Sequence, residues 1–163
     1  MQRDASWWRG RRGEWYVVIQ LVLFALVAVG PTTWRGWPAW PFPAGRLVSA
    51  AGGVLLAAGA ALAIAGALKH GAALQALPYP SESGTLIHSG PYRIVRHPSY
   101  SGALAAAFGW ALWRHGWLTL VYAALLCLLF DAKARREEEW LVEKFPSSAE
   151  YQRRVRKLVP FLY

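Results

Sequence analysis

The chain has 163 residues, the length of one domain, and 55% of them are hydrophobic while 17% are charged. This balance differs from that of a soluble globular protein and indicates a membrane protein. The formal net charge of +9 would also suit a protein that binds nucleic acid, but the long uncharged segments described below argue against that class. The single cysteine, Cys127, excludes an intrachain disulfide.

The first uncharged run covers residues 15–34, which are 20 residues. A bilayer core of about 30 Å needs about 20 helical residues, so this run is long enough to cross it. We predict a helix from Trp15 to Gly30, because Pro31 cannot continue it. The preceding residues, 1–14, are rich in arginine and contain tryptophan, which is typical of a juxtamembrane segment that contacts lipid headgroups.

The second uncharged run covers residues 47–68, which are 22 residues. Gly52, Gly59 and Gly66 recur in it every seven residues, and a stripe of small residues lets a second membrane helix approach closely. We interpret the stripe as a packing surface. Residues 69–97 follow as the longest polar stretch. We expect them to form a functional cytoplasmic loop, because long loops in compact proteins are usually functional or disordered.

Two shorter apolar runs follow, Pro98–Trp113 with 16 residues and Gly116–Phe130 with 15. Only Arg114 and His115 separate them. The two runs therefore predict a tight helical hairpin whose turn lies near the far membrane surface.

The C-terminal region, residues 131–163, is expected to be helical and cytoplasmic. No helix breaker stands before Pro146, so the fourth helix should continue into water. A last amphipathic helix is predicted from Ser148 to Leu158. The apolar tail after it is expected to dock back onto the protein or the lipid.

The basic residues predict the orientation in the membrane. With the N-terminus in the cytoplasm, 15 of the 18 lysines and arginines lie on the cytoplasmic side, and only Arg35, Arg46 and Arg114 lie outside. The sequence therefore predicts a single membrane-embedded domain of residues 1–163. We expect an all-α helical bundle with four apolar segments, integral to a bacterial-type plasma membrane, with both termini cytoplasmic.

One polar stretch, residues 90–102, places charged side chains at the start of a helix. Pro98 suits the first turn of a helix and disfavours helical backbone at His97, so the helix should begin at this junction. A helix N-terminus favours an anion, and Arg96 beside it could bind a carboxylate or phosphate through two hydrogen bonds. The acids Glu137–Glu139 should reach the same membrane face, because the hairpin returns there. Each group alone would also suit a plain headgroup-facing or solvated position.

Two motifs resemble those of a known family. The signature of the isoprenylcysteine carboxyl methyltransferases and their phospholipid-methylating relatives is similar to Gly90-Pro91-Tyr92-x-x-x-Arg96-His97-Pro98-x-Tyr100-x-Gly102. The C-terminal motif of the same family is similar to Glu137-Glu138-x-x-Leu141-x-x-x-Phe145, followed by Tyr151, Val155 and Pro160. The resemblance extends from Gly71 to Tyr163, and the joint occurrence of both motifs makes it specific.

The resemblance implies an integral membrane methyltransferase that uses S-adenosylmethionine (SAM). Its acceptor would be a lipophilic or small membrane-accessible carboxylate, thiol or amine at the cytoplasmic face, with membrane lipid as a partner. The candidate catalytic residues are Arg96, His97 and Tyr100. The candidate cofactor-binding residues are His88, Gly90, Tyr92, Arg96, His97, Tyr100, Glu137 and Glu138.

The chemistry of SAM agrees with these residues. The cofactor carries a carboxylate that Arg96 or His97 could bind, and hydroxyl and ammonium groups that could donate to a glutamate. In-line methyl transfer depends mainly on alignment and on a dry site. Two questions stay open at this point: whether Arg96 serves the cofactor or the acceptor, and which of the acids Glu137–Glu139 binds the cofactor.

Other functions are compatible with parts of the sequence. A non-enzymatic lipid-binding scaffold or small transporter would explain the basic cytoplasmic face. Transporters usually place ionisable groups near the membrane centre, however, and these spans contain none. A membrane reductase of related architecture would need a larger nicotinamide site than this short chain offers. No histidine or cysteine cluster has metal-ligand spacing, so no metal is expected.

The route of the acceptor is a separate prediction. An apolar acceptor is expected to enter sideways between helices, past the small residues Gly102 and Ala106. The alternative is that these residues only pack helices together.

Overall fold

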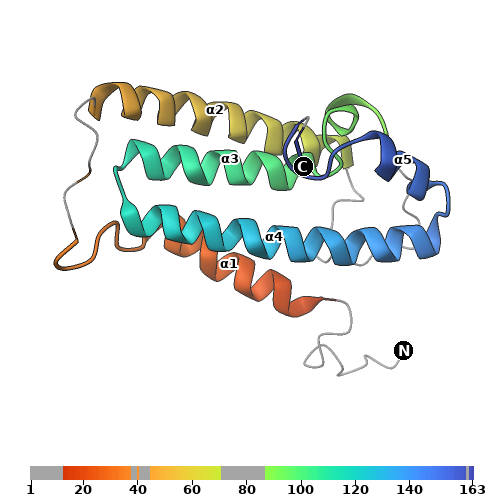
Figure 1. Ribbon diagram of the computed structural model, residues 1–163, viewed down its shortest axis with the longest axis horizontal. Helices are drawn as coiled ribbons and strands as arrows, with labels where there is room; N and C mark the ends of the chain where they lie inside the picture. The colour runs from red at the N-terminus through yellow and green to blue at the C-terminus, as the bar shows by residue number, and fades with distance from the viewer. Residues whose placement is uncertain (1–12, 38–39, 41–44, 71–86, 161) are drawn as a thin grey trace.

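The computed structural model describes residues 13–37, 40, 45–70, 87–160 and 162–163. Most of the predicted juxtamembrane segment and residues 71–86 of the predicted loop lie outside the described residues. The described part of the chain contains no strand. Its helices are α1 (Glu14–Val29), α2 (Gly45–His70), the short 3₁₀ helix η3 (Gly90–Arg93), α3 (Pro98–Trp113), α4 (Trp117–Lys144) and α5 (Ser148–Arg154) (Figure 1).

The four long helices confirm the four predicted apolar segments and the hairpin of α3 and α4. Helix α4 extends past its apolar run to Lys144, as the absence of a breaker predicts, and ends just before Pro146. Helix α5 is shorter than predicted. Its last turn is lost because Val155 has extended backbone and Arg156 pairs with Val95 in an isolated parallel β-bridge.

The helices pack side by side, with α3 and α4 in the middle, α2 against α3 and α1 against α4 (Figure 1). His115 adopts a left-handed conformation, with a φ of 51°, in the tight turn between α3 and α4. Helix α1 contributes Leu23 and Val27 to the buried core. The ring of Phe24 contacts Phe130 of α4, with centroids 6.0 Å apart. The starts of α1 and α3 and the ends of α2 and α4 lie at one end of the bundle (Figure 1).

Helices α2 and α3 lie in direct backbone contact along the predicted stripe of small residues. A Cβ atom added to Gly59 would lie 2.6 Å from the carbonyl oxygen of Gly102, and one added to Gly102 would lie 2.3 Å from the amide nitrogen of Ala63. Gly52 and Gly66 approach α3 similarly closely. The packing prediction is confirmed. The predicted lateral passage past Gly102 is wrong, because the backbone of α2 fills the space beside it.

Much of the outer surface of these helices is apolar. Val54 on α2 and Leu128 on α4 are 71% and 68% exposed, and such side chains are more stable in lipid than in water. Among the described residues, two helices are long and apolar enough to cross a membrane, Gly45–Lys69 within α2 and Trp117–Lys144, and α1 is a shorter apolar helix. The architecture is the predicted all-α membrane helical bundle.

Candidate active site

The two sequence motifs meet where η3, the start of α3, the polar end of α4 and the chain after α5 come together (Figure 1). The chain after α5 runs beside the first motif. The Arg96 N–H donates to the Arg156 carbonyl at 2.8 Å. The His97 N–H donates to the Lys157 carbonyl at 3.2 Å. These bonds fix the backbone that leads into α3.

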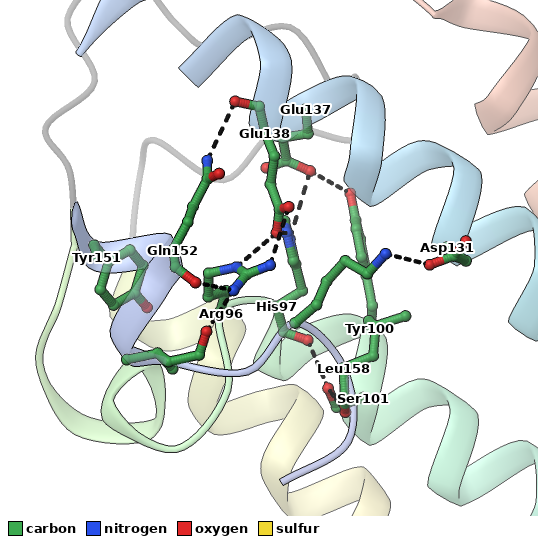
Figure 2. Close-up of polar contacts among 12 residues, drawn as sticks. Arg96, His97, Tyr100, Ser101, Asp131, Glu137, Glu138, Tyr151, Gln152 and Leu158 are labelled. Atoms are coloured by element: carbon green, nitrogen blue, oxygen red, sulfur yellow. Dashed lines mark hydrogen bonds and ion pairs between the residues drawn. The ribbon is translucent and has the colours of Figure 1, made fainter. Parts of the chain in front are cut away.

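Protein groups bind Arg96 on several sides. Its Nε and Nη2 donate to the two carboxylate oxygens of Glu138 at 2.7 and 3.1 Å, which makes a bidentate ion pair (Figure 2). Its Nη1 donates to the backbone carbonyls of Gln152, at 2.7 Å, and Val155. The side chains of Arg96 and Glu138 are only 13% and 14% exposed. Arg96 therefore joins α4 to the chain around α5 and keeps few donors for a ligand.

His97 and Tyr100 form a column of stacked rings with Phe130. The His97 and Tyr100 rings are nearly parallel, with an interplanar angle of 2° and centroids 5.3 Å apart. Tyr100 stacks on Phe130 at 4.6 Å. The Nε2 of His97 donates to Glu138 at 2.9 Å, and the Tyr100 hydroxyl donates to Oε2 of Glu137 at 2.9 Å (Figure 2). Both acids are thus hydrogen-bonded to the start of α3.

The three neighbouring acids have different surroundings. Glu138 uses both carboxylate oxygens for the contacts described above. Glu139 is exposed and pairs with Arg136 at 2.8 Å, as expected of a solvated helix face. Glu137 is 24% exposed. Its Oε2 accepts the tyrosine hydroxyl, while its Oε1 accepts no hydrogen bond from any residue that the structure describes. A carboxylate oxygen so placed can accept from a ribose hydroxyl or an ammonium group, so the acids present fit SAM.

The remaining predicted residues lie beside this network. His88 is exposed, and its ring contacts Tyr151 edge-on at 5.1 Å. Gly90 starts η3 with a left-handed φ of 63°, which glycine adopts easily. The carbonyl of Tyr92 accepts the Tyr151 hydroxyl at 2.6 Å. Burial raises the pKa of Tyr92, with a smaller contribution from Glu137, and burial raises the pKa of Tyr151 to about 12. Both phenols therefore stay protonated near neutral pH.

Several supporting residues carry little or no sequence signal. Gln152 binds Arg96 through its backbone carbonyl, which any residue supplies, and its side-chain amide also donates to the Glu138 carbonyl at 3.3 Å. Ser101 stands at an unassigned position of the first motif, yet its hydroxyl donates to a backbone carbonyl of the C-terminal tail at 2.6 Å. Phe130 could be found from its spacing. It precedes Glu137 by two helical turns and so lies on the same face of α4.

The C-terminal tail docks onto the protein, as predicted. Lys157 forms an ion pair with Asp131, and the Tyr163 hydroxyl donates to the same carboxylate at 2.9 Å. Leu158 enters the hydrophobic core. The tail is therefore held in the position from which its carbonyls bind the first motif.

Fold and site together define a helical membrane protein with a buried network of acids, stacked rings and one arginine at one end of the bundle. Residues 47–148, well over half of the chain, match the family model described as phospholipid methyltransferase. Comparison with curated proteins finds none that matches. The chain belongs to the phospholipid methyltransferase family and is a membrane methyltransferase, which confirms the family resemblance of the two motifs.

Proposed function

We propose that this methyltransferase moves a methyl group from SAM to the amine of a membrane phospholipid at the cytoplasmic face. The observation that carries the proposal is the position of Glu137 at the edge of the buried network. Tyr100 holds one of its carboxylate oxygens, and the other accepts no hydrogen bond within the described chain. That oxygen suits the hydroxyl and ammonium groups of SAM. A phospholipid acceptor is supported by the family description.

The residues of the network have different roles in this proposal. When bound, SAM supplies an electrophilic methyl group on its sulfonium sulfur. The protein must align the two reactants, which is the main demand of an in-line transfer. Arg96, His97 and Glu138 hold the end of α4 against the start of α3. Tyr100 then holds Glu137 so that its carboxylate offers a fixed hydrogen-bond acceptor to the cofactor.

The other predicted cofactor-binding residues have a supporting role in this proposal. His88, Gly90 and Tyr92 belong to the loop beside the network, and Tyr151 binds that loop through the Tyr92 carbonyl. These residues would hold the loop close to the cofactor without touching the reacting atoms.

Glu137→Gln is expected to lower kcat/KM for SAM about 10- to 150-fold, because a hydrogen bond to a charged group is worth about 1.5–3 kcal/mol. The measurement is transfer of a labelled methyl group from SAM to phosphatidylethanolamine vesicles. Glu139→Gln makes the same chemical change on the exposed face of the same helix and should keep the wild-type rate. Equal rates in the wild type and Glu137→Gln would remove Glu137 from the site.

We also propose that both termini and residues 69–97 face the cytoplasm of a bacterial-type plasma membrane, which the 15-to-3 distribution of basic residues supports. Single cysteines at Ser89 and Thr33, in a Cys127→Ser background, test the orientation with an impermeant thiol reagent on intact cells. We expect labelling at position 33 and none at position 89. Labelling at position 89 but not at position 33 would reverse the orientation.

A further inference from the structure

Lys133 is a buried cation beside the site, and the roles proposed above do not use it. Only 1% of it is exposed, and it precedes Glu137 on α4 by about one helical turn. Its Nζ donates to the side-chain oxygen of Gln20 at 2.7 Å and lies 5.2 Å from the centre of the Tyr100 ring. Lysine is almost never this deeply buried unless other groups hold its charge, so the arrangement points to a role.

The Lys133 ammonium lies over the ring of Tyr100, the residue that binds Glu137. A cation within about 6 Å of the centre of an aromatic ring is attracted to the ring. Lys133 and Glu137 also attract each other, because they carry opposite charges on the same face of α4. The Tyr100 hydroxyl in turn donates to Oε2 of Glu137. Lys133 therefore restrains both partners of the hydrogen bond that leaves Oε1 of Glu137 for a ligand.

The hydrogen bond to Gln20 connects this arrangement to α1. Helix α1 lies outside residues 47–148, which the family model matches. Gln20 is one turn from Phe24, whose ring packs on Phe130, so the Lys133 ammonium has an acceptor on a packed helix. Helix α1 thus reaches the site through a specific polar contact.

We propose that Lys133 is a positioning residue for methyl transfer. Held by Gln20, its ammonium fixes the ring of Tyr100 and the carboxylate of Glu137, so that the tyrosine hydroxyl stays on Oε2 and Oε1 is presented to the cofactor. The inference rests on the proposed methyltransferase function and adds α1 to the elements that build its site.

Lys133→Met tests the role, because methionine keeps an apolar stem of similar length and removes the ammonium group, with its charge and its hydrogen bond to Gln20. We expect kcat/KM for SAM, measured by labelled-methyl transfer to phosphatidylethanolamine vesicles, to fall about 30-fold, the size of a desolvated cation–π contact. Lys133→Arg should recover most of the loss. Gln20→Leu should show a smaller loss in the same direction. Lys144→Met, a lysine at the exposed end of the same helix, should match the wild type.

A double-mutant cycle with Tyr100→Phe separates positioning from simple structural support. Phenylalanine keeps the ring but loses the hydroxyl. In the Tyr100→Phe background, Lys133→Met should therefore lower kcat/KM by a further factor of less than about two. The proposal is overturned if Lys133→Met loses the same factor in both backgrounds, or if its folded fraction has wild-type activity. A wild-type protein that transfers no methyl group would instead contradict the proposed function itself.

Discussion

Replacing Arg96 with alanine is expected to abolish SAM binding and to lower the free energy of unfolding by about 3–5 kcal/mol, the cost of removing one partner of a buried ion pair. The change leaves the largely buried Glu138 carboxylate without its bidentate partner. It also removes the donor that binds the carbonyls of Gln152 and Val155. Because these contacts join α4 to the chain around α5, the whole site should lose its arrangement.

Two variants sharpen this test of Arg96. Arg96→Lys should recover only part of both losses, because an ammonium cannot pair with a carboxylate in a bidentate way and reach two carbonyls at once. Arg93→Ala removes an exposed arginine of η3 and should change neither quantity. Thermal unfolding in detergent and calorimetric titration with SAM measure the two effects. Wild-type melting temperature and wild-type affinity in Arg96→Ala would contradict the assigned role.

Gly59→Leu should separate α2 from α3, and we expect it to destabilise the protein by at least about 3 kcal/mol, the upper range for overpacking. The first atom of the new side chain would lie 2.4 Å from the Ala106 amide nitrogen and 2.6 Å from the Gly102 carbonyl oxygen. Both are backbone atoms, so no side-chain rotation can relieve the contact. Yield of folded protein and its melting temperature are the measurements.

Gly53→Leu is the matched control for Gly59→Leu. A Cβ atom added to Gly53, on the same helix, meets nothing within 4 Å, and leucine favours helix over glycine. Gly53→Leu should therefore be as stable as the wild type or more stable. Equal stability of both leucine variants would show that the α2–α3 contact is not close-packed.

The sequence predicted the membrane helices well, because uncharged runs and breakers act locally. Pro98 and Pro146 mark helix boundaries by the geometry of proline alone. The residue at which α5 ends could not be predicted from local sequence patterns. Residues 155 and 156 would fit a helix by their own preferences, but Arg156 pairs with Val95, which is distant in sequence. Tertiary contacts therefore override local preference there.

The candidate site was predicted in composition but only partly in roles. The two motifs predicted one site that contains Arg96, His97, Tyr100, Glu137 and Glu138. The structure places these side chains in one network. The difference between the two glutamates depends on which oxygens are already bonded, and spacing along the chain carries no such information.

Lys133 and Gln20 illustrate a second limit of sequence reasoning. Lys133 stands in a basic stretch after an apolar run, where a lysine usually reaches toward lipid headgroups. Gln20 is a single amide in the first apolar helix. Their contact depends on how α1 packs on α4, and no pattern within either segment indicates that packing.

The most direct test of the central claim is the transfer reaction itself. Purified wild-type protein is incubated with SAM carrying an isotopically labelled methyl group and with phosphatidylethanolamine vesicles, and the lipids are analysed by mass spectrometry. We predict the mass increment of a labelled methyl group on the headgroup amine, with Glu137→Gln strongly reduced. Label found only on a carboxylate or thiol acceptor would contradict the phospholipid amine as substrate. No label on any lipid or added acceptor, with SAM left intact, would contradict methyl transfer by this site.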